Sequence, residues 1–260
     1  MLNSIYHQIR ILSDQKKRQL AVLIDPDKVD EEGVMRIAEL VNRYRADYIF
    51  TGGSLLTSDF LGTCLKILKE TVHVPVIIFP GNTMQVHPEA DAILLLSLIS
   101  GRNPELLIGN HVIAAPGLKK SGLEIMPTGY MLIESGKLTS VVYMSNTIPI
   151  PSDKPDIASC TAMAGEMLGM RLIYMDAGSG AVMPVPARMI RHVRSNIKVP
   201  LIVGGGIRTS DDAIKSWDAG ADIIVVGNAT EHEPEFIGRL CESRDNLNSV
   251  TNREYHKLTR

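Results

Sequence analysis

Short hydrophobic runs of strand length recur along the chain and alternate with segments of helical periodicity. Each run leads into a loop that contains glycine, aspartate or proline. The runs are continuous rather than alternating, which is typical of parallel strands that are covered on both faces. The strands are expected at 21–24, 48–50, 76–79, 92–96, 129–133, 172–175, 201–203 and 223–226.

Between these runs, helices are expected at 30–44, 58–71, 104–111, 157–168, 186–195, 210–219 and 234–241. Eight strands in this order favour a closed α/β barrel of the (β/α)8 TIM type. An open doubly wound sheet fits less well, because no G-x-G-x-x-G motif follows the first strand. The segment 138–155 contains three prolines, so we expect an irregular fifth connection. We interpret residues 1–260 as a single barrel domain, because 260 residues is a normal length for this fold.

Composition narrows the class of partner. The chain has 27 basic and 29 acidic residues and a net charge of -2, so no overall field favours nucleic acid, and we expect no nucleic-acid partner. No apolar stretch approaches the roughly 20 residues of a spanning helix, so no transmembrane segment is expected. The three cysteines have no metal-ligand spacing and fit a reduced, cytoplasmic protein.

Glycine-rich loops follow the last three expected strands. They read D-A-G-S-G at 176–180, G-G-G-I-R at 204–208 and G-N-A at 227–229. Glycine lets backbone N–H groups approach a phosphate, and barrels commonly bind phosphate after their last strands. Any one of these loops could equally be a tight turn, but the three together predict a phosphate site.

Carboxylate and hydroxyl groups follow the first two strands instead. Asp25 begins D-P-D-K, and Ser54 ends T-G-G-S. Oxygen ligands of this kind suit a Mg²⁺ ion that keeps several waters and is completed by substrate phosphates. The alternative is that the aspartates only start a turn and cap the following helix.

Several motifs together resemble the geranylgeranylglyceryl phosphate synthase family, and its longer, second group in particular. They are LIDPDK, TGGSLLT, VIIFPGN, ADAILLLSLISGRNPELLIG, EIMPTGYMLIESGK, YMDAGSGA, VGGGIRT and ADIIVVGNA, in order along nearly the whole chain. Shorter bacterial relatives typically carry a lysine where this chain has Leu23.

The resemblance implies a Mg²⁺-dependent prenyltransferase of phospholipid biosynthesis. The prenyl group of geranylgeranyl diphosphate, a polyprenyl diphosphate, would pass to the C3 hydroxyl of sn-glycerol 1-phosphate with release of diphosphate, giving an archaeal-type ether lipid. Asp25 and Ser54 match the metal ligands of the family. The positions that match its glycerol-phosphate contacts are Tyr174, Met175, Asp176, Ala177, Gly178, Ser179, Gly180, Gly205, Gly206, Gly227 and Asn228.

Asp176 is the candidate catalytic residue, as the base that accepts the proton of the acceptor hydroxyl. Relatives commonly carry Glu there, and Asp keeps the charge but is one methylene shorter. Candidate walls of an apolar groove for the prenyl chain are Leu55, Leu56, Phe60, Leu95, Leu98 and Ile99.

Three other functions are compatible with these residues. They are the same chemistry with a longer, heptaprenyl donor, a different phosphate-binding barrel isomerase or lyase, and a non-catalytic barrel subunit. We also expect a homo-oligomer and transient membrane contact for the lipid product.

Overall fold

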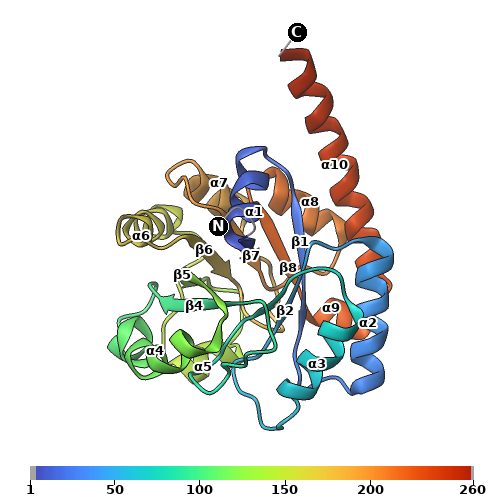
Figure 1. Cartoon of the computed structure of the whole chain (residues 1–260). Coiled ribbons are helices and arrows are strands. Elements are labelled where there is room, and N and C mark those ends of the chain that lie inside the picture. Colours follow the sequence, from blue (N-terminus) through green and yellow to red (C-terminus); the bar gives the residue numbers. More distant parts are fainter. Residues whose placement is uncertain (1–3, 259–260) are drawn as a thin grey trace.

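The computed structural model describes residues 4–258, and side chains as far as residue 250. Eight parallel strands close into one barrel in chain order, with β1 paired to both β2 and β8 (Figure 1). This confirms the predicted (β/α)8 architecture. The strands are β1 (Gln19–Ile24), β2 (Tyr48–Thr51), β3 (Val76–Ile78), β4 (Ala92–Leu98), β5 (Glu124–Leu132), β6 (Leu172–Asp176), β7 (Leu201–Gly204) and β8 (Ile223–Val226).

Helices surround the barrel and occupy most of the predicted segments. They are α1 (Ile5–Asp14), α2 (Glu31–Tyr44), α3 (Leu61–Thr71), the π-helical turn η1 (Glu105–Gly109), α4 (Asn110–Ser121), α5 (Ser140–Ser145), α6 (Pro155–Met167), α7 (Ala187–Arg194), α8 (Ser210–Asp218), α9 (Asn228–His232) and α10 (Phe236–Leu258). No helix in the described part of the chain has the length and apolar character needed to span a bilayer.

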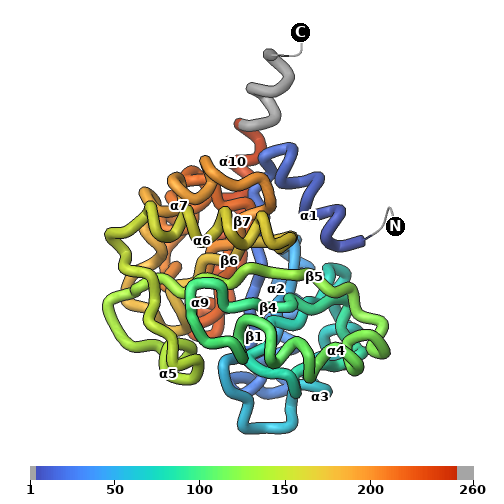
Figure 2. Tube along the Cα trace, turned by 90° about the vertical axis from the view of Figure 1, so that its left-hand side faces the viewer, coloured from blue at the N-terminus to red at the C-terminus, as the bar shows by residue number. Residues whose placement is uncertain are grey.

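Helix α1 was not predicted, because its segment is short and largely polar. Ser4 caps it by accepting a hydrogen bond from the His7 N–H, and Ile5 and Ile9 are buried. The Glu124 carboxylate at the start of β5 accepts the N–H groups of Ile5 at 2.6 Å and Tyr6 at 2.9 Å. This contact places a negative charge at the positive end of the helix dipole. Figures 1 and 2 both show α1 at the same end of the barrel as α10, opposite α3 and α5.

The connections around β4 and β5 depart most from a regular pattern. The helix expected to end at residue 111 begins as η1 and continues as α4 to Ser121, despite Pro116 in its interior. The fifth connection is irregular, as predicted: it holds the short α5 and an isolated parallel bridge between Ile133 and Ile150. Both segments lie beside the carboxyl end of the barrel, so their irregularity shapes the site described below.

The amino-terminal end of the barrel, which we call the base, repeats one polar contact three times. An aspartate just before an even-numbered strand accepts the N–H of a residue in the preceding strand: Asp47 from Leu20 at 2.8 Å, Asp91 from Val76 at 2.9 Å, and Asp222 from Leu201 at 2.7 Å. Each aspartate also pairs with a basic residue of a surrounding helix, and these partners are Arg244, Lys69 and Arg194.

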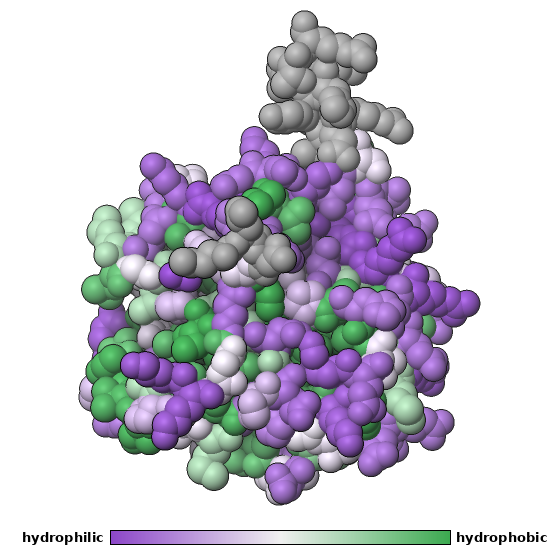
Figure 3. All heavy atoms as spheres, in the orientation of Figure 1, coloured by the Kyte–Doolittle hydropathy of each residue, from purple (hydrophilic) through white to green (hydrophobic). Residues whose placement is uncertain are grey.

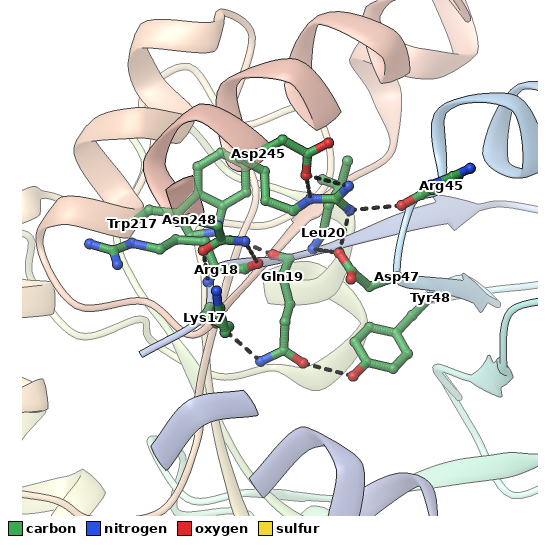
Figure 4. A network of polar contacts seen from close by, with 11 residues as sticks. Lys17, Arg18, Gln19, Leu20, Arg45, Asp47, Tyr48, Trp217, Asp245 and Asn248 are labelled. Atoms are coloured by element: carbon green, nitrogen blue, oxygen red, sulfur yellow. Dashed lines mark hydrogen bonds and ion pairs between the residues drawn. The ribbon is translucent and has the colours of Figure 1, made fainter. Parts of the chain in front are cut away.

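Figure 4 shows the first of these three contacts within a larger network. Arg244 of α10 contacts Asp47, the Arg45 carbonyl and Asp245, and its side chain is 6% exposed. Beside it, the Tyr48 hydroxyl donates to Gln19 at 2.7 Å. The network fastens α10 to the first two strands at the base.

Candidate active site

A cavity of about 1550 Å³ opens at the carboxyl ends of the strands, which we call the mouth. Most of the predicted site residues line it. These are Asp25, Ser54, Tyr174, Asp176, Ser179, Gly180, Gly205, Gly206, Gly227 and Asn228. The carboxylate and hydroxyl of the first two loops and the glycine-rich loops after the last three strands therefore face one shared cavity.

Three of the predicted acceptor contacts, Met175, Ala177 and Gly178, do not line the cavity. Met175 and Ala177 belong to the hydrophobic cluster between the barrel and its helices, with Met175 fully buried. Gly178 takes a left-handed φ of +90°, and its N–H points at the Asp176 carboxylate. These residues shape the loop after β6, and the predicted contacts of Met175 and Ala177 with an acceptor could come only from their backbones.

Asp176 ends β6 with its carboxylate at the inner edge of the cavity, and the residue is 7% exposed. Its Oδ2 accepts a hydrogen bond from the Tyr130 hydroxyl at 2.5 Å, and its Oδ1 accepts the Gly178 N–H at 2.7 Å. Burial raises the pKa of Asp176, and the two hydrogen bonds oppose that rise. A raised pKa with a fixed orientation suits a carboxylate that accepts a proton near neutral pH.

An aromatic cluster lies beneath Asp176 inside the barrel. The Phe79 ring stacks on Tyr174 with centroids 5.3 Å apart, and Tyr130 meets both rings edge-on. Burial raises the pKa of both tyrosines well above the ordinary value, so their hydroxyls stay protonated donors. A Cβ on Gly204 would lie 2.5 Å from the Tyr174 hydroxyl oxygen, which explains glycine at that position.

Asn228 connects the loops of the acceptor side. Its Oδ1 accepts the Ser179 hydroxyl at 2.9 Å and the Gly180 N–H at 3.2 Å. Gly205 has a φ of +80°, and a Cβ there would lie 2.6 Å from the Gly178 nitrogen. Only glycine at this position lets the two loops approach so closely. The result is a concave backbone surface of the kind that binds phosphate.

On the opposite side, Asp25 faces the backbone of the loop after β2. A Cβ on Gly53 would lie 3.1 Å from Asp25 Oδ1, and Ser54 follows directly. Buried Gln85 holds this loop, since it donates to the Gly53 carbonyl at 3.1 Å and accepts the Gly81 N–H at 2.9 Å. The carboxylate and the hydroxyl thus lie on two neighbouring, braced loops.

The other two aspartates after β1, Asp27 and Asp30, stabilise the local backbone. Asp30 caps α2 by accepting the Gly33 N–H at 2.9 Å. Asp27 accepts four hydrogen bonds from the backbone and hydroxyls of Thr57 and Ser58, chiefly the Ser58 hydroxyl, which lower the pKa of Asp27 to about 2. The helix cap and the loop contact therefore leave Asp25 facing the cavity.

The oxygen donors here fit Mg²⁺. One carboxylate and one hydroxyl beside a large cavity leave coordination positions for water and for substrate phosphates, as Mg²⁺ prefers. Within the described residues no cluster of three histidine, cysteine or acidic side chains could form an all-protein metal cage. A metal held mainly by substrate oxygens is consistent with that composition.

Apolar side chains extend the cavity between β4 and the segments η1, α4 and α5. Of the six predicted wall residues, Leu55, Leu95 and Leu98 line this cavity. The other three do not: Leu56 is half-buried outside the cavity lining, Phe60 packs against the core, and Ile99 lines a separate groove beside α6. Residues of the irregular connections complete the wall, namely Leu106, Ala114, Leu118, Leu138, Val141, Tyr143 and Met144.

Comparison with known proteins agrees with this geometry. The sequence model described as the PcrB family matches residues 13–243. The chain belongs to the PcrB family. It is 52% identical to a geranylgeranylglyceryl phosphate synthase of Chitinophaga pinensis over 94% of this chain and 96% of that protein. A synthase of the same name from Korarchaeum cryptofilum is 41% identical over 88% of this chain and 94% of that one.

A solved structure of the family resembles this chain over nearly its full length. It is the (S)-3-O-geranylgeranylglyceryl phosphate synthase of Thermoplasma acidophilum in complex with its substrate sn-glycerol-1-phosphate. The two agree with a TM-score of 0.87 and 32% identity, covering 92% of this chain and 98% of the other. These findings confirm the family resemblance that the motifs indicated.

Sequence reasoning missed several charged and polar residues of the mouth. Lys28, Lys137, Arg208 and Glu231 all line the cavity, and Tyr130 binds Asp176. The D-P-D-K and E-S-G-K motifs contain the two lysines, so a search for cations just after each strand could have found them. Nothing in the sequence pairs Tyr130 with Asp176, because that contact depends on the register of β5 against β6.

Proposed function

We propose that this chain is a prenyltransferase that joins the prenyl group of geranylgeranyl diphosphate to the C3 hydroxyl of sn-glycerol 1-phosphate. The observation that carries the proposal is that one cavity combines a carboxylate and a hydroxyl on one side, a glycine-lined anion surface on the other, and an apolar wall between β4 and α5. The names of the family members support the same activity.

The acceptor phosphate would bind the loops after β6, β7 and β8, where the Gly205, Gly206 and Gly227 backbones face the cavity. Asp176 lines the same cavity, so the glycerol C3 hydroxyl of an acceptor bound there would lie within its reach. Each carboxylate oxygen of Asp176 has already accepted one hydrogen bond, and each retains a lone pair for a further one.

The chemical step forms a bond between the glycerol C3 oxygen and prenyl C1, and breaks the bond between C1 and the diphosphate oxygen. The hydroxyl proton passes to the Asp176 carboxylate. When bound at Asp25 and Ser54, Mg²⁺ would offset the negative charge of the departing diphosphate. The cavity holds the two substrates together, which removes much of the entropic barrier.

The apolar wall would hold the prenyl chain, because each buried CH₂ contributes roughly 0.8 kcal/mol. Leu95 and Leu98 of β4 form one side of this space, and Tyr143 and Met144 of α5 lie on the other. We propose a donor of about 20 carbons, as the names of the relatives indicate. A heptaprenyl donor uses the same reaction and is distinguished by the assay below.

Incubation with sn-glycerol 1-phosphate and prenyl diphosphates of several lengths, with and without Mg²⁺, tests the proposal. Mass analysis should detect the geranylgeranyl ether of glycerol phosphate only when Mg²⁺ is present. A parallel reaction with sn-glycerol 3-phosphate shows whether the loops distinguish the handedness of the acceptor. Absence of an ether product with every donor would contradict the proposal.

Two groups of exposed hydrophobic residues bear on the expected self-association and membrane contact. Exposed hydrophobic residues of η1, α4 and α6 lie on one side of the molecule, where Figure 3 shows hydrophobic side chains gathered. They are Ile108, Val112, Ile113, Ile157, Met167 and Leu168. Such a patch on a soluble domain marks an association surface, so we propose that two or more copies assemble through it. Light scattering should give a multiple of 28.5 kDa, and Val112→Glu should lower it.

A second group of exposed apolar residues lies at the rim of the mouth. Leu138, Tyr143 and Met144 line the cavity and are also at least 50% exposed. A lipid product could leave through this rim into a bilayer, so we propose transient membrane contact. Co-sedimentation with lipid vesicles should fall when Tyr143 is changed to Ser.

The free cysteines Cys64, Cys160 and Cys241 fit a reducing compartment, and we propose that the protein lies in the cytoplasm.

A further inference from the structure

Lys28 lies where the two sides of the mouth meet. Its backbone N–H donates to the Asp25 carbonyl at 3.0 Å, and this turn folds its side chain back over the cavity. Its ammonium is 3.1 Å from Asp25 Oδ2 and 3.6 Å from Glu231 Oε2. It is also 3.5 Å from the Ser179 hydroxyl of the acceptor loop. One cation therefore contacts the candidate metal ligand and the candidate phosphate loop together.

Glu231 places a second carboxylate beside the Lys28 ammonium. It belongs to α9, which begins at Asn228, the residue that holds Ser179 and Gly180. Its side chain is only 9% exposed, and that of Asp25 is 18% exposed. Two poorly solvated carboxylates therefore share one ammonium.

A divalent cation at Asp25 would change that balance. It would place two positive charges beside the ammonium and compete with it for the same carboxylate oxygen. The Lys28 side chain is 40% exposed and flexible, and the acceptor loop lies at hydrogen-bond distance on its other side. A phosphate bound on that loop would offer the ammonium a new anionic partner.

We propose that Lys28 is a binding residue with two positions. Without ligands its ammonium is the counter-ion of Asp25 and Glu231, and when a divalent metal takes Asp25 the ammonium moves to the phosphate of the acceptor. The inference rests on the proposed function, since it assumes a metal at Asp25 and a phosphate on the loop after β6. It makes Lys28 the residue that links metal binding at Asp25 to phosphate binding on the loop after β6.

The proposal predicts opposite changes in two affinities when Lys28 is replaced by Met. Mn²⁺ alone, counted by its electron paramagnetic resonance signal, should bind about fivefold more tightly, because a competing charge has gone. The affinity for sn-glycerol 1-phosphate in the presence of Mn²⁺, measured by calorimetry, should fall about tenfold or more, because a charge-assisted hydrogen bond has gone. General damage to the site would weaken both.

Two further variants serve as controls. Lys28→Arg retains the charge and should stay within about threefold of the wild type for both ligands. Lys66→Met removes the same charge from an exposed position on α3 and should change neither affinity. Thermal unfolding of each variant confirms that the fold is retained.

The outcomes separate this inference from the proposed function. If wild-type protein binds neither Mn²⁺ nor sn-glycerol 1-phosphate, the proposed function fails and this inference fails with it. If the wild type binds both, and Lys28→Met shifts both affinities in the same direction or shifts neither, the role of Lys28 is wrong while the proposed function stands.

Discussion

The two ends of the barrel use carboxylates in opposite ways. At the base, Asp47, Asp91 and Asp222 each accept a strand N–H and pair with a basic side chain. Burial raises the pKa of Asp47, Asp222 and Asp176 alike, but Asp176 at the mouth has no cationic partner among its hydrogen bonds. The three aspartates at the base satisfy the backbone, whereas Asp25 and Asp176 at the mouth face the cavity.

This difference separates stability from chemistry within one fold. Changes at the base should lower the free energy of unfolding and leave the reaction intact. A change at Asp176 should do the reverse, because its buried charge has no cation beside it and costs stability as it forms.

The largest effect is expected at Asp176. Asp176→Asn should lower turnover by roughly a thousandfold, the middle of the range for loss of a general base. The amide preserves the shape and removes the buried charge, so the free energy of unfolding at pH 7 should not fall. Single-turnover assays and urea unfolding measure the two quantities. Near-normal turnover would remove Asp176 from the mechanism.

At the base, Arg244→Met should be the most destabilising change. It leaves Asp47 without its cation, and breaking a largely buried pair costs about 3 kcal/mol. Urea unfolding measures the loss, and ether formation at low temperature should match the wild type. Arg239→Met is the matched control, since it breaks a fully exposed pair with Glu233 and should cost far less than Arg244→Met. Equal losses in both variants would contradict the account.

Tyr130 should control the pH dependence of the reaction. Its hydrogen bond lowers the pKa of Asp176 against the effect of burial, so Tyr130→Phe should raise that pKa. The base is then protonated over more of the acidic range, and the acidic limb of kcat/KM should move to higher pH. Below neutral pH the rate should fall about tenfold, the worth of a hydrogen bond of about 1.5 kcal/mol to a charged group.

Tyr48 provides the control for Tyr130 at the other end. It is also buried and donates its hydroxyl to Gln19 at the base. Tyr48→Phe should cost about 1 kcal/mol of stability and leave the pH profile unchanged. A displaced acidic limb in Tyr48→Phe, or an unmoved one in Tyr130→Phe, would show that the hydroxyl contact with Asp176 does not tune the base.

The smallest effect is expected at Asp27, which lies at the mouth but serves the fold. Hydrogen bonds from Ser58 and Thr57 lower the pKa of Asp27 from 3.8 to about 2. Its contribution is therefore present above about pH 4 and is lost as the pH falls through about 2. Because the group is exposed, Asp27→Asn should cost under about 1 kcal/mol at pH 7. Urea unfolding at pH 7 and pH 2.5 should show the difference from wild type narrowing, and a constant difference would be contrary to this role.

Most of the fold followed from the hydrophobic pattern. The eight strands lie where continuous apolar runs indicated them, because strands covered on both faces leave a strong local signal. Helices α1, α5 and α9 were missed: α5 and α9 are only one or two turns long, and α1 lies before the first strand, where the alternation of strands and helices predicts no helix. Helix α10 was expected to end at residue 241 but continues to Leu258, since its later residues are too polar to show a helical pattern.

The site was predictable only in part. Asp25, Ser54 and the glycine loops follow strand ends, and a closed barrel brings all strand ends to one mouth. The hydrogen bond of Tyr130 with Asp176 and the meeting of Lys28 with Glu231 join residues far apart in the chain. Such pairs depend on strand register and loop shape, which a single sequence does not reveal.

The most direct test of the division between base and mouth is a double-mutant cycle with Asp176→Asn and Arg244→Met. The free energies of unfolding of the wild type, both single variants and the double variant are measured at pH 7, together with ether formation. The account predicts that the stability changes add within about 0.5 kcal/mol and that only the Asp176 change abolishes product. Strong coupling between the two sites, or loss of product in Arg244→Met while it is folded, would contradict it.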